Sequence, residues 1–379
     1  MMWLIILGLV LAAVVAGLVY ISKCFQRFGI IRRIAGDRNW LRRLLAVLPL
    51  LVFFICAVFD TVNSIIVLLH LIMFSLVADG LYALWRAFVR HIRRNVREQR
   101  PGRPEEYRPY WRGIFVICFT AIYLSVCWYL AHHVWITRYD LTTEKSLGQE
   151  SLKVVLIADS HTGATFDGDG FAKEMEKVQK ENPDIVLIAG DFVDDGTSRK
   201  DMLRCCRALG ELKTTYGVYY SFGNHDKGYF RGRSFSYEEM TAELRANDVT
   251  VLEDEAVLVN DSFYIIGRKD RSEESRMDMQ ELVKDLDREK YMIVIDHQPN
   301  DYKAEAEAGV DLVVSGHTHG GQLIPINYIG EWIGVNDSTY GYKKKEATDF
   351  VVTSGISDWA IRFKSGTKSE IVVMQIRAD

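Results

Sequence analysis

The residues of this chain that could carry out chemistry are five histidines within residues 140–379, each near a carboxylate, an asparagine or a second histidine. They lie in the segments Asp159-Ser160-His161, Gly223-Asn224-His225-Asp226, Asp296-His297-Gln298-Pro299 and Gly316-His317-Thr318-His319, and Gly190-Asp191 falls between the first two. Carboxylate and imidazole ligands without a thiolate favour Mn²⁺, Fe or Zn²⁺. The set suffices for two divalent ions and predicts hydrolysis at phosphorus by a dinuclear centre.

The spacing within these segments predicts which side chains converge. In an extended segment the side chains at positions i and i+2 point to the same side. Asp159 and His161 therefore form one pair, and His317 and His319 form another. We expect Asp191 to bridge the two ions, because a shared carboxylate offsets their mutual repulsion. One such pair alone is more often a hydrogen-bonded turn, but their occurrence together favours a metal site.

Each segment follows an apolar run of the kind that forms a buried strand. These runs are 153–158, 184–189, 216–221, 292–295 and 311–315. Helices are expected at 170–181, 200–212, 237–247 and 279–289, and further strands at 252–259, 263–267, 350–354 and 370–376. The alternation predicts an α/β fold in which two sheets pack together with helices outside. Its ligands should lie beyond the carboxyl ends of the strands.

The ordered motifs resemble those of the calcineurin-like metallophosphoesterases. That family carries D-x-H, G-D-x-x-D, G-N-H-[DE], a single His and G-H-x-H, and all five stand in this sequence within residues 152–376. The segments 296–299, 316–322 and 361–363 are similar to the membrane-anchored bacterial branch, although Ser160 stands where that branch usually has Leu. The resemblance implies a two-sheet β-sandwich flanked by helices, a four-layer α/β/β/α fold, over residues 153–379.

The resemblance also implies a role for each ligand. The ligands would divide between two ions, with Asp159, His161 and His319 at the first, Asn224, His297 and His317 at the second, and Asp191 as the bridge. A hydroxide between the ions would attack phosphorus in line. His225 would protonate or orient the leaving oxygen, which is general-acid chemistry suited to an imidazole, and Asp194 would hold its ring.

Other segments are weaker candidates for contacts with a substrate. Arg231 and Arg233 follow the Asn-His-Asp turn, and a guanidinium can grip a phosphate through two hydrogen bonds; a solvated loop is the alternative. Arg362 enters only through the resemblance. The apolar segment Leu323–Val335 is either a lip that meets a membrane or a lipid chain, or part of the core. The lysines of 343–345 are expected in a solvated turn.

The first 138 residues are apolar and basic, whereas the rest of the chain is acidic. Residues 1–138 carry 17 Lys and Arg against 6 Asp and Glu, and residues 139–379 carry 29 against 44. Apolar runs predict four transmembrane helices at 3–21, 44–59, 65–85 and 113–135, and a polar connector is expected at 139–152. The acidic charge around the candidate site argues against a nucleic-acid partner.

Basic residues in the short loops predict the orientation in the membrane. Loop 22–43 carries seven Lys and Arg and loop 86–112 carries nine, whereas the turn at 60–64 has none. Both basic loops are therefore expected in the cytoplasm, which makes the C-terminal domain extracytoplasmic.

We therefore interpret the chain as an integral membrane phosphoesterase that uses two divalent ions. Its expected partners are membrane lipids and a phosphoester or pyrophosphate substrate of the envelope, lipid-linked in the favoured case. One alternative is a membrane sensor or assembly protein whose domain binds metal or ligand without turnover. Another keeps the chemistry but makes the membrane helices a transport module.

Overall fold

The computed structural model of the protein describes residues 2–93, 109–229 and 232–378. The chain forms two compact units, Met1–Val126 and Cys127–Asp379. The helices of the first unit are α1 (Met2–Phe25), α2 (Gly29–Ala35), α3 (Asn39–Phe59), α4 (Thr61–Arg93) and α5 (Trp111–His132). The last residues of α5, from Cys127 on, belong to the second unit.

The first unit has the helices expected of a membrane protein. Among the described residues, Asn39–Phe59, Thr61–Ile92 and Trp111–His132 are long and apolar enough to cross a bilayer, and the bent pair Ala12–Phe25 and Gly29–Ala35 makes a fourth candidate if it forms one span. Within this unit Asp79 pairs with Arg27 at 2.8 Å and with Arg112 at 3.3 Å. These ion pairs compensate an acidic group among apolar helices.

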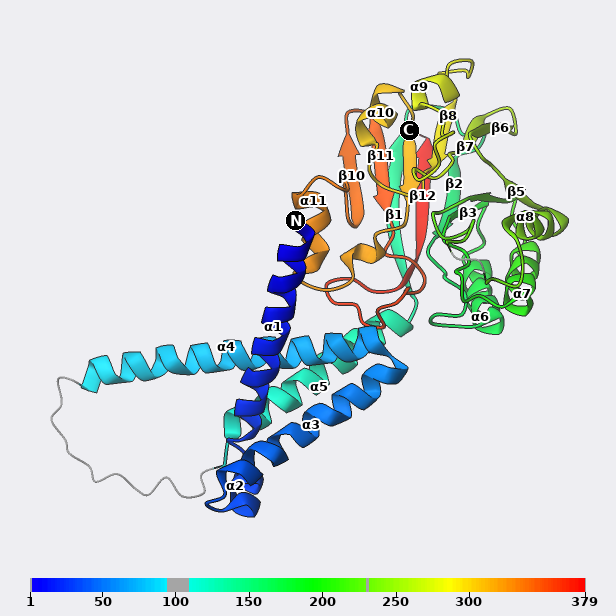
Figure 1. Ribbon diagram of the computed structural model, residues 1–379. Coiled ribbons are helices and arrows are strands. Elements are labelled where there is room, and N and C mark those ends of the chain that lie inside the picture. Colours follow the sequence, from blue (N-terminus) through cyan, green and yellow to red (C-terminus); the bar gives the residue numbers. More distant parts are fainter. Residues whose placement is uncertain (1, 94–108, 230–231, 379) are drawn as a thin grey trace. The chain divides into compact units, whose positions relative to one another are not determined.

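The second unit is built on two six-stranded sheets (Figure 1). The first sheet has the order β1-β12-β2-β3-β4-β5, with β1 (Trp135–Thr143), β2 (Ser151–Ile157), β3 (Ile185–Ala189), β4 (Val218–Ser221), β5 (Val249–Val251) and β12 (Glu370–Ala378). The second has the order β10-β11-β9-β8-β7-β6, with β6 (Glu255–Val259), β7 (Phe263–Gly267), β8 (Tyr291–Ile295), β9 (Leu312–Ser315), β10 (Gly341–Lys345) and β11 (Thr348–Val352). Strands β2 to β5 are parallel, and so are β7, β8, β9 and β11. Within each parallel set the carboxyl ends therefore lie at one edge.

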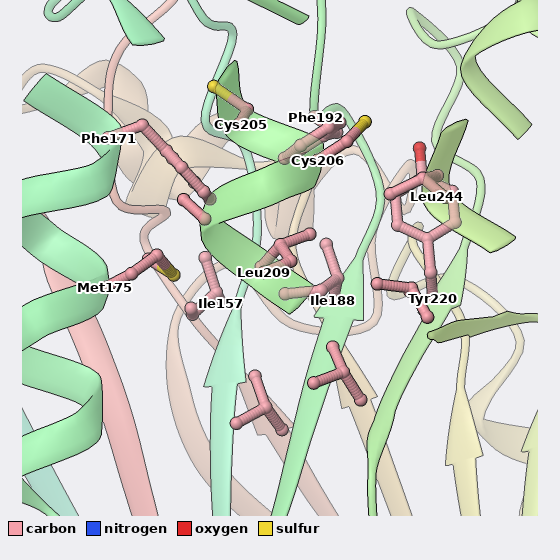
Figure 2. Close-up of a cluster of buried hydrophobic side chains, with 14 of the residues drawn as sticks. Ile157, Phe171, Met175, Ile188, Phe192, Cys205, Cys206, Leu209, Tyr220 and Leu244 are labelled. Atoms are coloured by element: carbon pink, nitrogen blue, oxygen red, sulfur yellow. The ribbon is translucent and has the colours of Figure 1, made fainter. Parts of the chain in front are cut away.

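Alternating side chains of the strands fill two different cores, because successive residues of a strand face opposite sides of the sheet. Ile157, Ile188 and Tyr220 pack against the helices that cover the first sheet, α6 (Gly168–Lys180), α7 (Arg199–Gly210) and α8 (Tyr237–Ala246) (Figure 2). Leu156 and Leu187 face the second sheet instead. A third core lies between that sheet and the short helices α9 (Met279–Leu282) and α10 (Tyr302–Glu307). The predicted four-layer α/β/β/α fold is confirmed.

The three helices over the first sheet begin at residues whose side chains cap them. Asp167 accepts a hydrogen bond from the backbone N–H of Gly170, and Ser198 and Ser236 do the same at α7 and α8. Such caps satisfy backbone donors that have no partner within the helix. The caps fix where each helix starts and hence the length of the loop that precedes it.

The structure differs from the sequence prediction at several elements. The connector expected at 139–152 is wrong in its first part, because β1 occupies 135–143 and pairs in parallel with β12. For the same reason the last predicted membrane helix ends at His132 rather than at residue 135. The helix expected over 279–289 is only four residues long. The lysines of 343–345 lie on edge strand β10, not in a turn.

Candidate metal centre

The predicted ligands lie on loops that each directly follow a strand. β2 is followed by Asp159 and His161, β3 by Asp191, β4 by Asn224 and His225, β8 by His297, and β9 by His317 and His319. The first three strands belong to one sheet and the last two to the other. The side chains therefore gather where the carboxyl edges of the two sheets meet.

One group of ligand atoms comes from Asp159, His161 and His319, which lie within 4.8 Å of one another. Nε2 of His319 is 4.0 Å from Oδ1 of Asp159. The backbone N–H of His317 donates to both carboxylate oxygens of Asp159, at 2.9 and 3.0 Å. Nδ1 of His319 lies 3.3 Å from the carbonyl oxygen of Ser357. A partner of this kind on one ring nitrogen orients the other toward a metal.

A second group comes from Asp191, His297 and His317, whose ligand atoms also lie within 4.8 Å of one another. Nε2 of His297 and Nδ1 of His317 are 3.1 and 2.9 Å from Oδ1 of Asn224. The other nitrogen of His297, Nδ1, is 2.7 Å from the carbonyl oxygen of Ala189, which directs Nε2 toward the group. Asn224 therefore lies beside His297 and His317, the two histidines with which the family resemblance groups it at the second ion.

Asp191 lies between the two groups. Its Oδ2 is 3.5 Å from Nε2 of His161 and 3.2 Å from Nε2 of His297. Its Oδ1 accepts a hydrogen bond from the backbone N–H of His225 at 2.8 Å. One carboxylate oxygen thus faces imidazoles of both groups, as a bridging ligand must.

The backbone around the ligands adopts an uncommon conformation. A positive φ occurs at Asp159 (54°), His161 (35°), Asp191 (49°), His317 (70°) and His319 (49°). Non-glycine residues rarely occupy this region, and such residues cluster at functional sites. The extended geometry that we expected at Asp159 and His161, and again at His317 and His319, is therefore wrong; left-handed turns position these side chains instead.

Glycine is required where two ligand loops cross. A Cβ atom at Gly316 would lie 2.5 Å from Oδ2 of Asp159 and 2.5 Å from Cβ of Ala158. Distances this short are well inside van der Waals contact, so any larger residue would displace the Asp159 carboxylate. The glycine of the Gly-His-Thr-His motif therefore leaves room for Asp159, which lies on the loop after β2 of the other sheet.

Several groups of the site have properties that suit a divalent cation. Both ring nitrogens of His161 are buried and lack a hydrogen-bond partner among the described residues, whereas buried polar atoms normally have one. Burial lowers the pKa of His161 and of His317 to about 4. Both rings are therefore neutral at pH 7, the form that binds metal. Burial also raises the pKa of Asp159 to about 7, and a nearby cation would favour its ionised form.

His225 and Asp194 form a pair beside these groups. Nδ1 of His225 lies 3.0 Å from Oδ1 of Asp194. Burial lowers the pKa of His225, but the hydrogen bond to Asp194 and the charge of Asp191 outweigh burial, and the net shift is upward. Ligand-type atoms of His161, Asp194 and His225 also fall within 4.8 Å of one another. The pair could therefore act on a substrate or bind a cation itself.

The three arginines predicted to contact the substrate have different surroundings. Arg231 lies outside the described residues. Arg233 is engaged by its own loop, since its Nη2 donates to the carbonyl oxygen of Asp226 at 2.7 Å and its guanidinium lies 4.6 Å from the ring centre of Phe235. Arg362 is exposed on the loop that precedes Lys364. The substrate roles of Arg233 and Arg362 stay predictions.

A buried carboxylate that was not predicted from the sequence organises the ligand loops. Asp226 accepts hydrogen bonds from the backbone N–H groups of Asp191, Phe192 and Gly223, at 2.9, 2.8 and 2.7 Å. It thereby fixes the loop after β3 to the loop after β4. The signal was its place directly after His225 in the Gly-Asn-His-Asp motif.

A buried lysine lies behind the first ligand group and was also missed. Nζ of Lys364 donates to the carbonyl oxygens of Ser354 and Ser357, at 2.7 and 3.2 Å, and pairs with Asp358 at 3.2 Å. The carbonyl of Ser357 is the group beside Nδ1 of His319. Lys364 therefore supports His319, one of the predicted ligands, through the backbone of the 354–358 loop.

Comparisons with known proteins agree with this geometry. The calcineurin-like phosphoesterase family matches residues 152–321. A metallophosphoesterase of Aquifex aeolicus is 34% identical over 51% of this chain and 72% of its own length. A metallophosphoesterase of Helicobacter pylori J99 is 31% identical, and the aligned region spans 60% of each protein. A zebrafish transmembrane protein with a metallophosphoesterase domain is 28% identical over 58% of this chain and 52% of its own length.

Proposed function

Because this chain belongs to the calcineurin-like phosphoesterase family, we propose that it is a membrane-anchored hydrolase of phosphoric esters or pyrophosphates. The observation that carries the proposal is the convergence of two ligand groups around one carboxylate oxygen of Asp191. The family uses two divalent metal ions, and Mn²⁺, Fe or Zn²⁺ suits this mixture of carboxylate, amide and imidazole ligands.

The ligand groups would hold the two ions at the positions that the geometry offers. Asp159, His161 and His319 would hold one, Asn224, His297 and His317 the other, and Asp191 both. When bound, such ions polarise phosphoryl oxygens and make a bound water acidic enough to act as a nucleophile near neutral pH.

His225 would supply the proton that the leaving oxygen needs. Its Nδ1 is held by Asp194, so Nε2 is left to face a substrate. The raised pKa keeps a larger fraction of the ring protonated near neutral pH. A positively charged donor placed beside a developing alkoxide is an effective general acid.

The apolar helices suggest a membrane protein, and this favours a substrate that is itself in the membrane. We infer a lipid or envelope phosphoester or pyrophosphate. The basic residues of loops 22–43 and 86–112 favour a cytoplasmic location of these loops. The catalytic domain would then lie on the extracytoplasmic side.

Turnover by the purified full-length protein tests the proposal. With Mn²⁺ added, the protein should hydrolyse an aryl phosphomonoester or phosphodiester, and Asp191→Asn should abolish this activity. Asp285→Asn, at an exposed position beyond α9, is the matched control and should retain it. Bound metal without turnover of any such ester would instead favour the sensor interpretation.

A further inference from the structure

The segment Leu323–Val335, which we call the apolar lip, presents large apolar side chains to solvent. It contains α11 (Ile329–Trp332). The exposed side chains include Ile324, Ile326, Tyr328, Ile329, Trp332 and Ile333, with 75% exposure at Trp332. Core packing, one of the two sequence interpretations of this segment, is therefore wrong for these residues. Large apolar side chains that are exposed together on one short segment indicate an interaction surface.

The outer surface of the apolar lip is uncharged. Glu331 is the one charged residue in its sequence, and its side chain turns back to the domain. Its Oε1 accepts from the backbone N–H of Thr339 at 2.6 Å, and its Oε2 accepts from Nζ of Lys343 at 2.9 Å. An apolar environment can therefore receive the lip without taking up an unpaired charge.

The apolar lip is fixed to the loop that carries His319. A Cβ atom at Gly321 would lie 2.2 Å from Cα of Asn327, so the base of the lip packs closely against this loop. Nε2 of Gln322 donates to Oδ1 of Asp358 at 3.0 Å and to the carbonyl oxygen of Ile361 at 2.8 Å. The lip and the 358–369 loop are therefore held together beside the first ligand group.

The 358–369 loop is in turn bonded to the end of α5. The backbone N–H of Lys364 donates to the carbonyl oxygen of Cys127 at 3.0 Å, and that of Ser369 donates to the carbonyl oxygen of Leu130 at 2.9 Å. These carbonyls belong to the last turns of the candidate span Trp111–His132. Trp128 and Tyr129 are exposed there, as aromatic residues often are where a helix leaves the bilayer.

We propose that the apolar lip docks into the interfacial region of the same bilayer that α5 crosses. The hydrogen bonds that lead from Cys127 through the 358–369 loop to Gln322 hold the lip close to the point where this helix ends. Its tyrosine, tryptophan and isoleucine side chains are those that favour the boundary between headgroups and acyl chains. Docking would keep the metal centre at headgroup level, which, if the proposed hydrolysis holds, suits a phosphoester borne by a lipid.

The test is to locate position 332 of the full-length protein in phospholipid nanodiscs. Trp332→Cys, in a chain whose exposed Cys56 and Cys118 are replaced by alanine, is labelled with an environment-sensitive fluorophore. Leu258→Cys is the matched control, since Leu258 is an exposed apolar residue on β6. Quenching is measured with iodide in the water and with lipids that carry a nitroxide near the headgroup.

The label at 332 should be quenched severalfold more by the nitroxide lipids than the label at 258, and severalfold less by iodide. Equal quenching of the two labels by iodide would overturn the proposal. Protection of the 332 label from both quenchers would also overturn it, because another protein or a second copy of the chain would then cover the lip. The label reports position whether or not the protein turns over, so this outcome is separate from the test of hydrolysis.

Discussion

Replacing Asp194 by asparagine should separate general-acid catalysis from metal binding at the His225–Asp194 pair. The side chain keeps its size, and its remaining oxygen can still accept the hydrogen bond that the backbone N–H of Asp195 gives at 2.8 Å. What disappears is the negative charge 3.0 Å from Nδ1 of His225. A hydrogen bond to a charged group contributes about 1.5–3 kcal/mol. Because this energy favours the protonated ring of His225, its loss should lower the protonated fraction, and with it kcat at a pH above the pKa of His225, by up to about 10- to 150-fold.

The size of the loss should depend on the leaving group. A 4-nitrophenyl ester departs as a weakly basic phenolate, whereas an alkyl ester needs a proton from His225. The full loss is therefore expected for the alkyl ester and a much smaller one for the 4-nitrophenyl ester. Without the Asp194 charge the pKa of His225 also falls, because that charge contributes to its upward shift. The basic limb of the pH–rate profile for the alkyl ester should therefore move to lower pH.

The assay combines kinetics with metal analysis of the same samples. Asp194→Asn should retain the wild-type metal content, and so should the neighbouring control Asp195→Asn, which should also retain activity. Loss of bound metal from Asp194→Asn, with equal loss of activity on both esters, would refute the reasoning. It would mean that Asp194, His225 and His161, whose ligand-type atoms also lie within 4.8 Å of one another, act as a cation site instead.

Three further perturbations test the structure around the site. Arg268→Met should lower stability by about 3–5 kcal/mol and thus the unfolding temperature, because it removes the guanidinium that the carboxyl groups of Asp296, Asp301 and Glu305 share, at 3.0, 2.8 and 3.3 Å; an unchanged temperature would contradict this. Burial raises the pKa of the Cys205 thiol to about 12, so native protein at pH 8 should not react with maleimide there until it unfolds, as peptide mapping can establish. Gly316→Ala should reduce metal content at a fixed free metal concentration, because the new methyl group would meet Oδ2 of Asp159 at 2.5 Å; wild-type metal affinity would contradict this.

The convergence of the predicted ligands could be found from sequence because each one follows a buried strand directly. The apolar runs before Asp159, Asp191 and His317 identify strands whose carboxyl ends must meet, so convergence follows once the strands are parallel. The backbone conformation of the loops that carry these residues could not be predicted from the apolar runs. The positive φ at Asp159 and His161 depends on hydrogen bonds from their backbone N–H groups to the carbonyls of Gly190 and Asp191, which are distant in sequence.

Errors at the edges of the fold have a common physical cause. Strand β1 lies at a sheet edge and has only Leu141 buried along its length, so it lacks the apolar run that reveals a central strand. Strand β10 is also an edge strand, and its lysines are the residues that edge strands use against aggregation. The pairing partner, rather than the local composition, makes these segments strands.

The buried groups behind the ligands illustrate what a local pattern cannot contain. Lys364 supports His319 only because the chain between them folds back, so that Gln322 meets Asp358 and the carbonyl of Ser357 comes within 3.3 Å of the ring. The buried ammonium group of Lys364 needs its acceptors, the carbonyls of Ser354 and Ser357 and the carboxylate of Asp358, because burying a charge without partners costs too much free energy. A lysine directly after Ile361-Arg362-Phe363 would ordinarily be assigned to solvent. Lys364 is buried because the 354–358 loop has no regular structure of its own. The ammonium group binds the carbonyls of this loop and so holds the Ser357 carbonyl beside the His319 ring.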